Sequence, residues 1–307
     1  MIILKFGHWH LVRKNRCSDR FCRWNSSSHI LCFLPSTENF GLVGELPGEL
    51  GHLAKLENLV IKDEKIGGMI PSSLGHLTRL RQLGLYRNEL VGSIPPELFR
   101  ATNLDYVNLQ NNRLVGAIPV DVQFCSRLKT LVLTDNKLDG EIPFESLAAT
   151  PIRYLGLGGN AFSGPLSEFV GAMSRLEYLY LDRNRFSGEL PVGLSGLTNL
   201  KALDLDDNEF SGAVTVPFNY LTKLQRVSMA NNRLSGAFPK ALAKIPSIQT
   251  LNLSGNNFFG PLPDISQMDG IVNLFLQQNG FSGVIHGSFS SSEKLGKREI
   301  YFGDVDL

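Results

Sequence analysis

The chain has 307 residues, 43% of them hydrophobic, which is enough to build one large core or two ordinary ones. Its formal net charge is only +1 at pH 7 and no run of lysine or arginine lies on a single face, so nothing favours binding to nucleic acid. No apolar stretch reaches the roughly 18 to 20 residues that a bilayer crossing needs, so we expect no membrane span in this chain.

Residues 1–39 are interpreted as an irregular N-terminal leader or a degenerate cap. The segment Met1–Val12 starts apolar but has no small-residue cleavage site after it, so it is not predicted to be a signal peptide. The spacing of histidine and cysteine here fits no closed zinc pattern, so we predict no metal site. Three cysteines could tie a disulfide cap or remain free thiols, and both readings stay open: Cys17, Cys22 and Cys32.

A repeat with a period of 24 residues begins near residue 40. A half repeat at residues 42–47 is followed by about ten repeats, and Glu64 occupies in the first of them the place that asparagine takes later. A period in this range is typical of a solenoid. The asparagines that mark the repeat are Asn88, Asn112, Asn136, Asn160, Asn184, Asn208, Asn232 and Asn256, with Asn279 after one deletion.

Each repeat follows the string LxxLxLxxNxLxGxIP, and its physical chemistry predicts a local structure. Leu83 and Leu85 alternate as the inward side of a short strand. Asn88 follows where the chain must turn, and its amide can both donate to and accept from backbone groups. Gly92 suits a close backbone approach or a positive φ, and Ile94-Pro95 suits an extended segment.

Stacking is what stabilises such a chain, because one repeat alone cannot bury its six or seven apolar side chains. The predicted fold is an α/β repeat solenoid: a right-handed superhelix with a concave parallel β-sheet and a convex side of 3-10 or short helical turns. The solenoid should span residues 40–290, with a degenerate C-terminal cap or tail at 291–307. On the helical side, Cys125 is expected to be a small buried side chain, and His52 and His76 are expected to be equivalent repeat positions.

The outward positions of the strands carry no packing duty, so they are the candidate ligand-binding positions. Arginines share this face, and three glycines, Gly156, Gly158 and Gly159, should leave one strand bare enough for a ligand backbone to approach closely. Aromatic side chains and arginines are common anchors at interfaces, although tyrosine also simply suits exposed strand positions. The predicted ligand-binding residues are Tyr86, Tyr106, Tyr154, Tyr178, Tyr180, Asp182, Asp204 and Asp206, with Asp207 beside them.

Two glycosylation sequons occur, at Asn25 and at Asn252, and both are usable if the chain enters the secretory route. Asn252 should point out of its strand. No phosphate-binding loop, kinase signature, nucleophile elbow or zinc-protease motif is present, so we predict neither enzymatic activity nor a cofactor.

The Gly-x-Ile-Pro half of the repeat resembles the plant-specific class of leucine-rich repeats. It stands at Gly92–Pro95, Gly116–Pro119 and Gly140–Pro143, and the resemblance covers about residues 40 to 290. Similar solenoids form the ectodomains of plant receptor-like kinases and receptor-like proteins, and also the secreted polygalacturonase inhibitors. Those families are extracellular and glycosylated, and they bind peptides, small hormones, microbial products or co-receptors.

The resemblance implies a receptor-like recognition module that acts in cell-surface signalling or defence. Its partner would be a protein, a peptide or a small extracellular ligand on the concave face, with a possible co-receptor, and its location would be the cell surface or the extracellular space. Two alternatives stay open. One is a soluble enzyme inhibitor or decoy, and the other is an intracellular protein-interaction scaffold in the cytoplasm.

Overall fold

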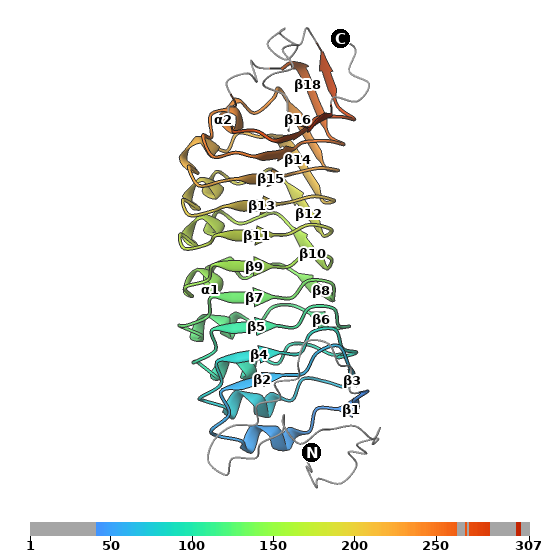
Figure 1. Cartoon of the computed structure of the whole chain (residues 1–307), viewed down its shortest axis with the longest axis vertical. Coiled ribbons are helices and arrows are strands. Elements are labelled where there is room, and N and C mark those ends of the chain that lie inside the picture. Colours follow the sequence, from blue (N-terminus) through green and yellow to red (C-terminus); the bar gives the residue numbers. More distant parts are fainter. Residues whose placement is uncertain (1–40, 263–267, 269, 283–298, 302–307) are drawn as a thin grey trace. The chain divides into compact units, whose positions relative to one another are not determined.

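The computed structural model describes residues 41–262, 268, 270–282 and 299–301 (Figure 1). The predictions for the three N-terminal cysteines, for the sequon at Asn25 and for most of residues 291–307 lie outside this part of the chain. By its contacts the chain divides into two compact units, Met1–Pro151 and Ile152–Leu307, and each is described by itself below.

Unit 1 stacks one coil of chain per repeat. Its first row of parallel strands is β2 (Asn58–Val60), β4 (Gln82–Gly84), β5 (Tyr106–Asn108) and β7 (Thr130–Val132), paired in that order. Its second row contains β1 (Val43–Glu45) paired with β3 (Lys65–Gly67), and β6 (Val115–Gly116) paired with β8 (Lys137–Gly140). Between the rows run the turns η1 (Gly48–His52), η2 (Ser72–His76), η3 (Pro96–Arg100), η4 (Val120–Phe124) and helix α1 (Phe144–Ala148).

Unit 2 has the same construction. Its first row of parallel strands is β9 (Tyr154–Gly156), β11 (Tyr178–Tyr180), β13 (Ala202–Asp204), β15 (Arg226–Ser228), β17 (Thr250–Asn252), β19 (Asn273–Phe275) and β21 (Glu299–Tyr301). The second row is β10 (Ala161–Gly164), β12 (Arg185–Gly188), β14 (Glu209–Ala213), β16 (Arg233–Gly236), β18 (Asn257–Pro261) and β20 (Gly280–Ser282). The turns are η5 (Glu168–Ala172), η6 (Val192–Gly196), η7 (Phe218–Tyr220) and helix α2 (Lys240–Ala243).

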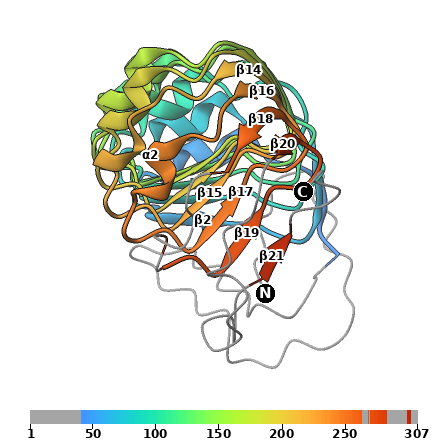
Figure 2. The same ribbon diagram turned by 90° about the horizontal axis from the view of Figure 1, so that it is seen from above.

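The predicted strands and short helical turns are therefore confirmed, whereas the second row of strands was not predicted. In unit 2 the helical turns, the first row and the second row lie on different sides of the coil (Figure 2). Proline positions most of the 3-10 turns: Pro71, for example, precedes η2 in extended backbone with φ −65° and ψ 129°. The proline ring fixes φ at a value that suits the start of a turn. Proline has no backbone N–H, and none is needed at this position.

The core consists of the repeat's leucine columns, and each coil covers the next. Leu83 and Leu85 are buried, as the alternation predicts. In most coils of unit 2, although not at Leu234, phenylalanine replaces leucine two residues after the asparagine, and three fully buried rings stack through successive coils. The centroids of Phe162 and Phe186 lie 6.4 Å apart, and those of Phe186 and Phe210 lie 6.0 Å apart.

The asparagine ladder forms the hydrogen bonds that the sequence predicts. The Asn184 amide nitrogen donates to the carbonyls of Leu157, Leu181 and Asp182 at 3.0 to 3.1 Å, and its oxygen accepts from the Phe162 N–H at 3.1 Å. Buried turn groups that would otherwise lose a partner are thereby satisfied.

Glu64 performs the acceptor half of this role in the first repeat. Its side chain is buried, and a carboxylate oxygen accepts from the Leu42 N–H at 2.7 Å, one period before the bond between Asn88 and the Ile66 N–H. Glutamate in place of asparagine thus keeps the hydrogen-bond acceptor that the backbone N–H of the preceding coil requires.

A backbone feature of the turn went unpredicted: the residue just before each ladder asparagine adopts a left-handed conformation. Arg87 and Arg183 have φ of 55° and 52°, which costs energy for a side chain with a Cβ. In the sequence, this conformation is indicated only by the frequent glycine, asparagine or aspartate at that position. The non-glycine members are Asp63, Arg87, Asn111, Asp135, Arg183, Asp207, Asn231 and Gln278.

Within the described residues, no helix combines the length and apolar character that crossing a membrane requires.

Candidate functional site

The outward face of the first strand row in unit 2 is the candidate site, and we call it the strand face. It carries three side-chain rows, set by the parallel register of β9, β11, β13 and β15. The first row is Tyr154, Tyr178, Ala202 and Arg226, and the second is Gly156, Tyr180, Asp204 and Ser228. The third row follows the strand ends and consists of Gly158, Asp182, Asp206 and Ala230.

Three tyrosines form one aromatic cluster on this face. The ring centroid of Tyr154 lies 5.7 Å from that of Tyr178 and 5.4 Å from that of Tyr180, and the last two lie 6.5 Å apart. Gly156 stands in register beside Tyr180 and has no side chain, so nothing from that position lies between the rings of Tyr154 and Tyr180. All three tyrosines are half-buried, which leaves ring surface available to a ligand.

Ion pairs flank the aromatic cluster at the start of the strands. Glu177 accepts from Lys201 at 2.7 Å and from Arg153 at 3.0 Å. The hydrogen bond from Lys201 outweighs partial burial and holds the pKa of Glu177 below its ordinary value. The Lys201 ammonium also lies 5.8 Å from the centroid of the Tyr178 ring, within the range of a cation–π contact.

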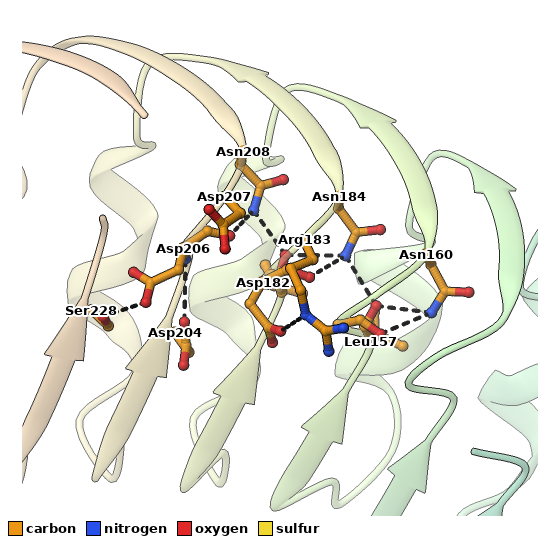
Figure 3. Close-up of polar contacts among 12 residues, drawn as sticks. Leu157, Asn160, Asp182, Arg183, Asn184, Asp204, Asp206, Asp207, Asn208 and Ser228 are labelled. Atoms are coloured by element: carbon orange, nitrogen blue, oxygen red, sulfur yellow. Dashed lines mark hydrogen bonds and ion pairs between the residues drawn. The ribbon is translucent and has the colours of Figure 1, made fainter. Parts of the chain in front are cut away.

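Three aspartates line the other end of the strands, where Figure 3 shows them with their polar contacts. Asp182 accepts from the Arg183 Nε at 3.0 Å. Asp206 accepts from the Ser228 hydroxyl at 2.6 Å and from the Ala230 N–H at 2.5 Å. Asp204 accepts from the Asp206 N–H at 3.2 Å, so the three carboxylates lie in two adjacent coils, each with its own hydrogen-bond donors.

Asp204 is more deeply placed than Asp182. Only 14% of its side chain is exposed, and its nearest cation is the Arg226 guanidinium at 3.7 Å. Burial first, and the neighbouring Asp206 charge second, raise the pKa of Asp204 to about 6. Burial also raises the pKa of Asp206, although the bonds from Ser228 and Ala230 oppose the shift. The pKa of the Tyr180 hydroxyl is raised as well, mainly by burial.

The expectation of a bare glycine strand is wrong. Gly156 and Gly158 are buried, and a methyl group built on Gly158 would lie 2.2 Å from an Asp182 carboxylate oxygen. The space above Gly158 is filled by the carboxylate of the next coil. This glycine therefore admits Asp182 rather than a ligand backbone.

The eight predicted residues fall in both units. Unit 2 brings together six of them, Tyr154, Tyr178, Tyr180, Asp182, Asp204 and Asp206, which we call the tyrosine–aspartate patch. Tyr86 and Tyr106 belong to unit 1, where they have separate surroundings. Lys62 lies 5.9 Å from the Tyr86 ring centroid, and the Tyr106 hydroxyl accepts from Asn108 at 3.0 Å.

Sequence reasoning missed the residues that pair with the patch. Ser228 and Arg226 lie two coils beyond Tyr178 and contact Asp206 and Asp204. Their only signal was the shared register of the repeat, since serine and arginine occur at many outward positions.

The remaining predictions outside the patch concern modification and burial. Asn252 is half-buried in β17, and its amide oxygen accepts from the Ser254 hydroxyl at 2.7 Å. Cys125 is buried, as expected, and burial raises its pKa to about 12. His52 and His76 end η1 and η2 at equivalent positions.

Comparison with known proteins agrees with the repeat and with the fold. The Leucine Rich Repeat family model matches residues 175–197 and 247–268. The comparison with curated protein sequences gave no match.

Solved structures of plant receptors match most of the chain. The Arabidopsis receptor kinase HAESA, in complex with the peptide hormone IDA and the co-receptor SERK1, is 34% identical over 84% of this chain, with a TM-score of 0.77. The ectodomain of GASSHO1/SCHENGEN3 from Arabidopsis thaliana, in complex with CASPARIAN STRIP INTEGRITY FACTOR 2, is 29% identical over 86% of this chain, with a TM-score of 0.71. The matches span 43% and 35% of those two receptor chains.

A plant ice-binding protein is also similar, with 27% identity, a TM-score of 0.65 and coverage of 79% of this chain and 78% of that protein. The repeat, the parallel strand rows and these matches lead to one identification. The chain is a leucine-rich-repeat solenoid whose structural neighbours include the ectodomains of plant receptor kinases.

Proposed function

We propose that this chain is a recognition module that binds a peptide or protein ligand on the strand face of unit 2 and catalyses no reaction. The observation that carries the proposal is the tyrosine–aspartate patch. Clustered aromatic rings supply large, rigid contact area, and charged groups beside them supply specificity. Similarity to receptors solved with a peptide hormone or with CASPARIAN STRIP INTEGRITY FACTOR 2 supports the same function.

We further propose a receptor-like role at the cell surface in signalling or defence, with a co-receptor as a second partner. The similarity to receptor ectodomains supports an extracellular location. In that location Asn252 would carry a glycan, since its sequon lies on an outward strand position. Asn252 stands in register with Ser228 of β15, so a glycan there would cover that end of the strand face.

Selection from a random peptide library displayed on phage tests the function directly. The full chain is immobilised as wild type, as the triple variant Tyr154→Ala, Tyr178→Ala, Tyr180→Ala, and as Tyr220→Ala. Tyr220 is the matched control, because it is 63% exposed on η7 and away from the strand rows.

The proposal expects the wild type and the Tyr220 variant to enrich the same peptides, and the triple variant to lose them. If the wild type enriches no peptide, or if the triple variant enriches the same set, the strand face of unit 2 is not the binding site.

A further inference from the structure

We propose that the patch binds an extended peptide through one cationic side chain, an arginine or a lysine, placed against Tyr180 and Asp204. This inference rests on the proposed function and adds the chemistry of the ligand. It is drawn from the shape of the strand face, its balance of charge and its aromatic surface.

Tyr180 and Asp204 are neighbours in register on β11 and β13, at the centre of the second row. The positions around them carry little side chain. Gly156 precedes Tyr180 in that row, Ser228 follows Asp204, and Ala202 stands at the start of the same strand as Asp204. These three small residues are buried, but 14% of the Asp204 side chain stays exposed beside the half-buried Tyr180, so a long ligand side chain can reach the carboxylate along that ring.

At this end of the strands, the described residues of unit 2 place more carboxylates than cations. Asp182, Asp204 and Asp206 face two guanidinium groups, those of Arg183 and Arg226. Arg226 stands 3.7 Å from Asp204, longer than a good charge-assisted hydrogen bond, and its side chain is 55% exposed. Asp182 has a close cation in Arg183, at 3.0 Å, whereas Asp204 is partly desolvated and has none that close. Asp204 therefore gains most from a cation that a ligand supplies.

Aromatic surface beside the carboxylates favours the same ligand group. Lys201 already lies over Tyr178, so the chain itself shows that this cluster accommodates a cation at 5.8 Å from a ring centroid. Tyr180 offers a second ring next to Asp204. A guanidinium that stacks on a ring while it pairs with a carboxylate uses both of its binding modes at once.

The dimensions suit an extended peptide. The patch spans β9, β11 and β13, and parallel strands lie about 4.8 Å apart, so it extends for roughly 10 Å across the strands. An extended peptide rises about 3.3 Å per residue, so about three residues would cover it. The basic residue would lie over β11 and β13, with an apolar residue toward Tyr154.

The test uses the phage-displayed library on the wild type, on Asp204→Asn, and on Asp139→Asn as a matched control, since Asp139 is exposed on β8 of unit 1. The best enriched peptide is then synthesised twice, once with its arginine or lysine and once with neutral citrulline at that position. Binding of both peptides is measured on each protein and on Arg226→Gln.

We expect one position of the enriched peptides to be arginine or lysine. Citrulline at that position, or Asp204→Asn in the protein, should each weaken binding by about tenfold or more, and the two changes together should add little further loss. Arg226→Gln should strengthen binding of the basic peptide a few fold, because it removes the competing cation, and Asp139→Asn should change nothing.

Several results would overturn the inference. Peptides that depend on the tyrosines but show no basic position, or a basic preference that survives Asp204→Asn, would leave the proposed function standing and refute the cation site. Weaker binding in Arg226→Gln would show that the patch attracts anions instead. Failure to enrich any peptide would refute the function and the inference together.

Discussion

Replacement of Asp204 by asparagine should make the protein more stable at neutral pH. In the folded state this carboxyl has a pKa of about 6, against an ordinary value of 3.8. Because the folded state holds the proton more tightly than the unfolded state, folding stability falls as pH rises from about 4 to about 6. The two pKa values differ by about 2.2 units, and at 1.36 kcal/mol per unit this corresponds to a loss of at most about 3 kcal/mol of folding free energy. The side chain is only 14% exposed, so solvent screens this cost little.

Asparagine has nearly the same shape and cannot ionise, so it removes this loss. We expect Asp204→Asn to raise the free energy of unfolding by about 1 to 3 kcal/mol at pH 7.5, and the difference to shrink toward zero near pH 4. Urea denaturation followed by circular dichroism at several pH values measures it, with Asp139→Asn as the control. The reasoning fails if the asparagine variant is less stable than the wild type at pH 7.5, or if the difference does not depend on pH.

Three further predictions concern the scaffold and the patch. Asn184→Ala should lower the free energy of unfolding by about 1 to 3 kcal/mol, because it leaves the buried Phe162 N–H without its acceptor, and a urea denaturation midpoint that does not move would contradict this. Phe186→Ala should cost about 3 to 5 kcal/mol in the same assay, since this ring stacks between two others, and a loss under 1 kcal/mol would mean that the coils collapse around the cavity. Gly158→Ala should displace the Asp182 carboxylate and weaken binding of the selected peptides while costing little stability; unchanged binding would remove Asp182 from the site.

The scaffold could be predicted from sequence because each of its columns performs one physical task. Leu83 must be apolar because every coil buries that position, and Gly92 must lack a side chain because its φ is 77° and Met69 lies 2.9 Å from where a Cβ would stand. Tasks that recur every 24 residues appear in the sequence as columns. The same reasoning recognised Glu64 as a member of the asparagine column.

The second strand row and the left-handed turn residue could not be predicted in this way. Both depend on backbone conformation, which several side chains tolerate, so no single residue type marks them. Arg183, with φ 52°, shows why: a strained backbone persists there because the neighbouring hydrogen bonds of the ladder determine the turn.

The ladder itself is partly redundant, which explains how it tolerates such strain. The Leu157 carbonyl accepts from Asn160 and from Asn184, both at 3.0 Å. The Leu181 carbonyl likewise accepts from Asn184 and Asn208. Loss of one asparagine therefore leaves these carbonyls bonded, so its cost is dominated by one orphaned N–H rather than by four lost bonds.

The details of the patch were beyond sequence reasoning because they depend on which side chain of one coil reaches the next. Gly158 was taken as an opening for a ligand, yet its missing Cβ makes room for the Asp182 carboxylate of the following coil. Outward residues were correctly placed by register, but their pairwise contacts follow from side-chain length and rotamer. The repeat pattern of the sequence does not specify which rotamer an outward side chain adopts or which neighbour it reaches.

One comparison separates a binding surface from a mere preference of tyrosine for strands. In unit 1, Tyr106 also stands on a strand of the first row and Tyr86 stands two residues after one, but the polar groups at their rings are Asn108 and Lys62 rather than a carboxylate. In unit 2 the tyrosines cluster beside Asp204, a carboxylate whose burial opposes folding above about pH 6. Strand propensity explains an isolated tyrosine, but it gives no reason to keep a destabilising aspartate beside three of them. A residue that costs stability where a neutral isostere would fit is best explained by a partner that it meets outside the chain.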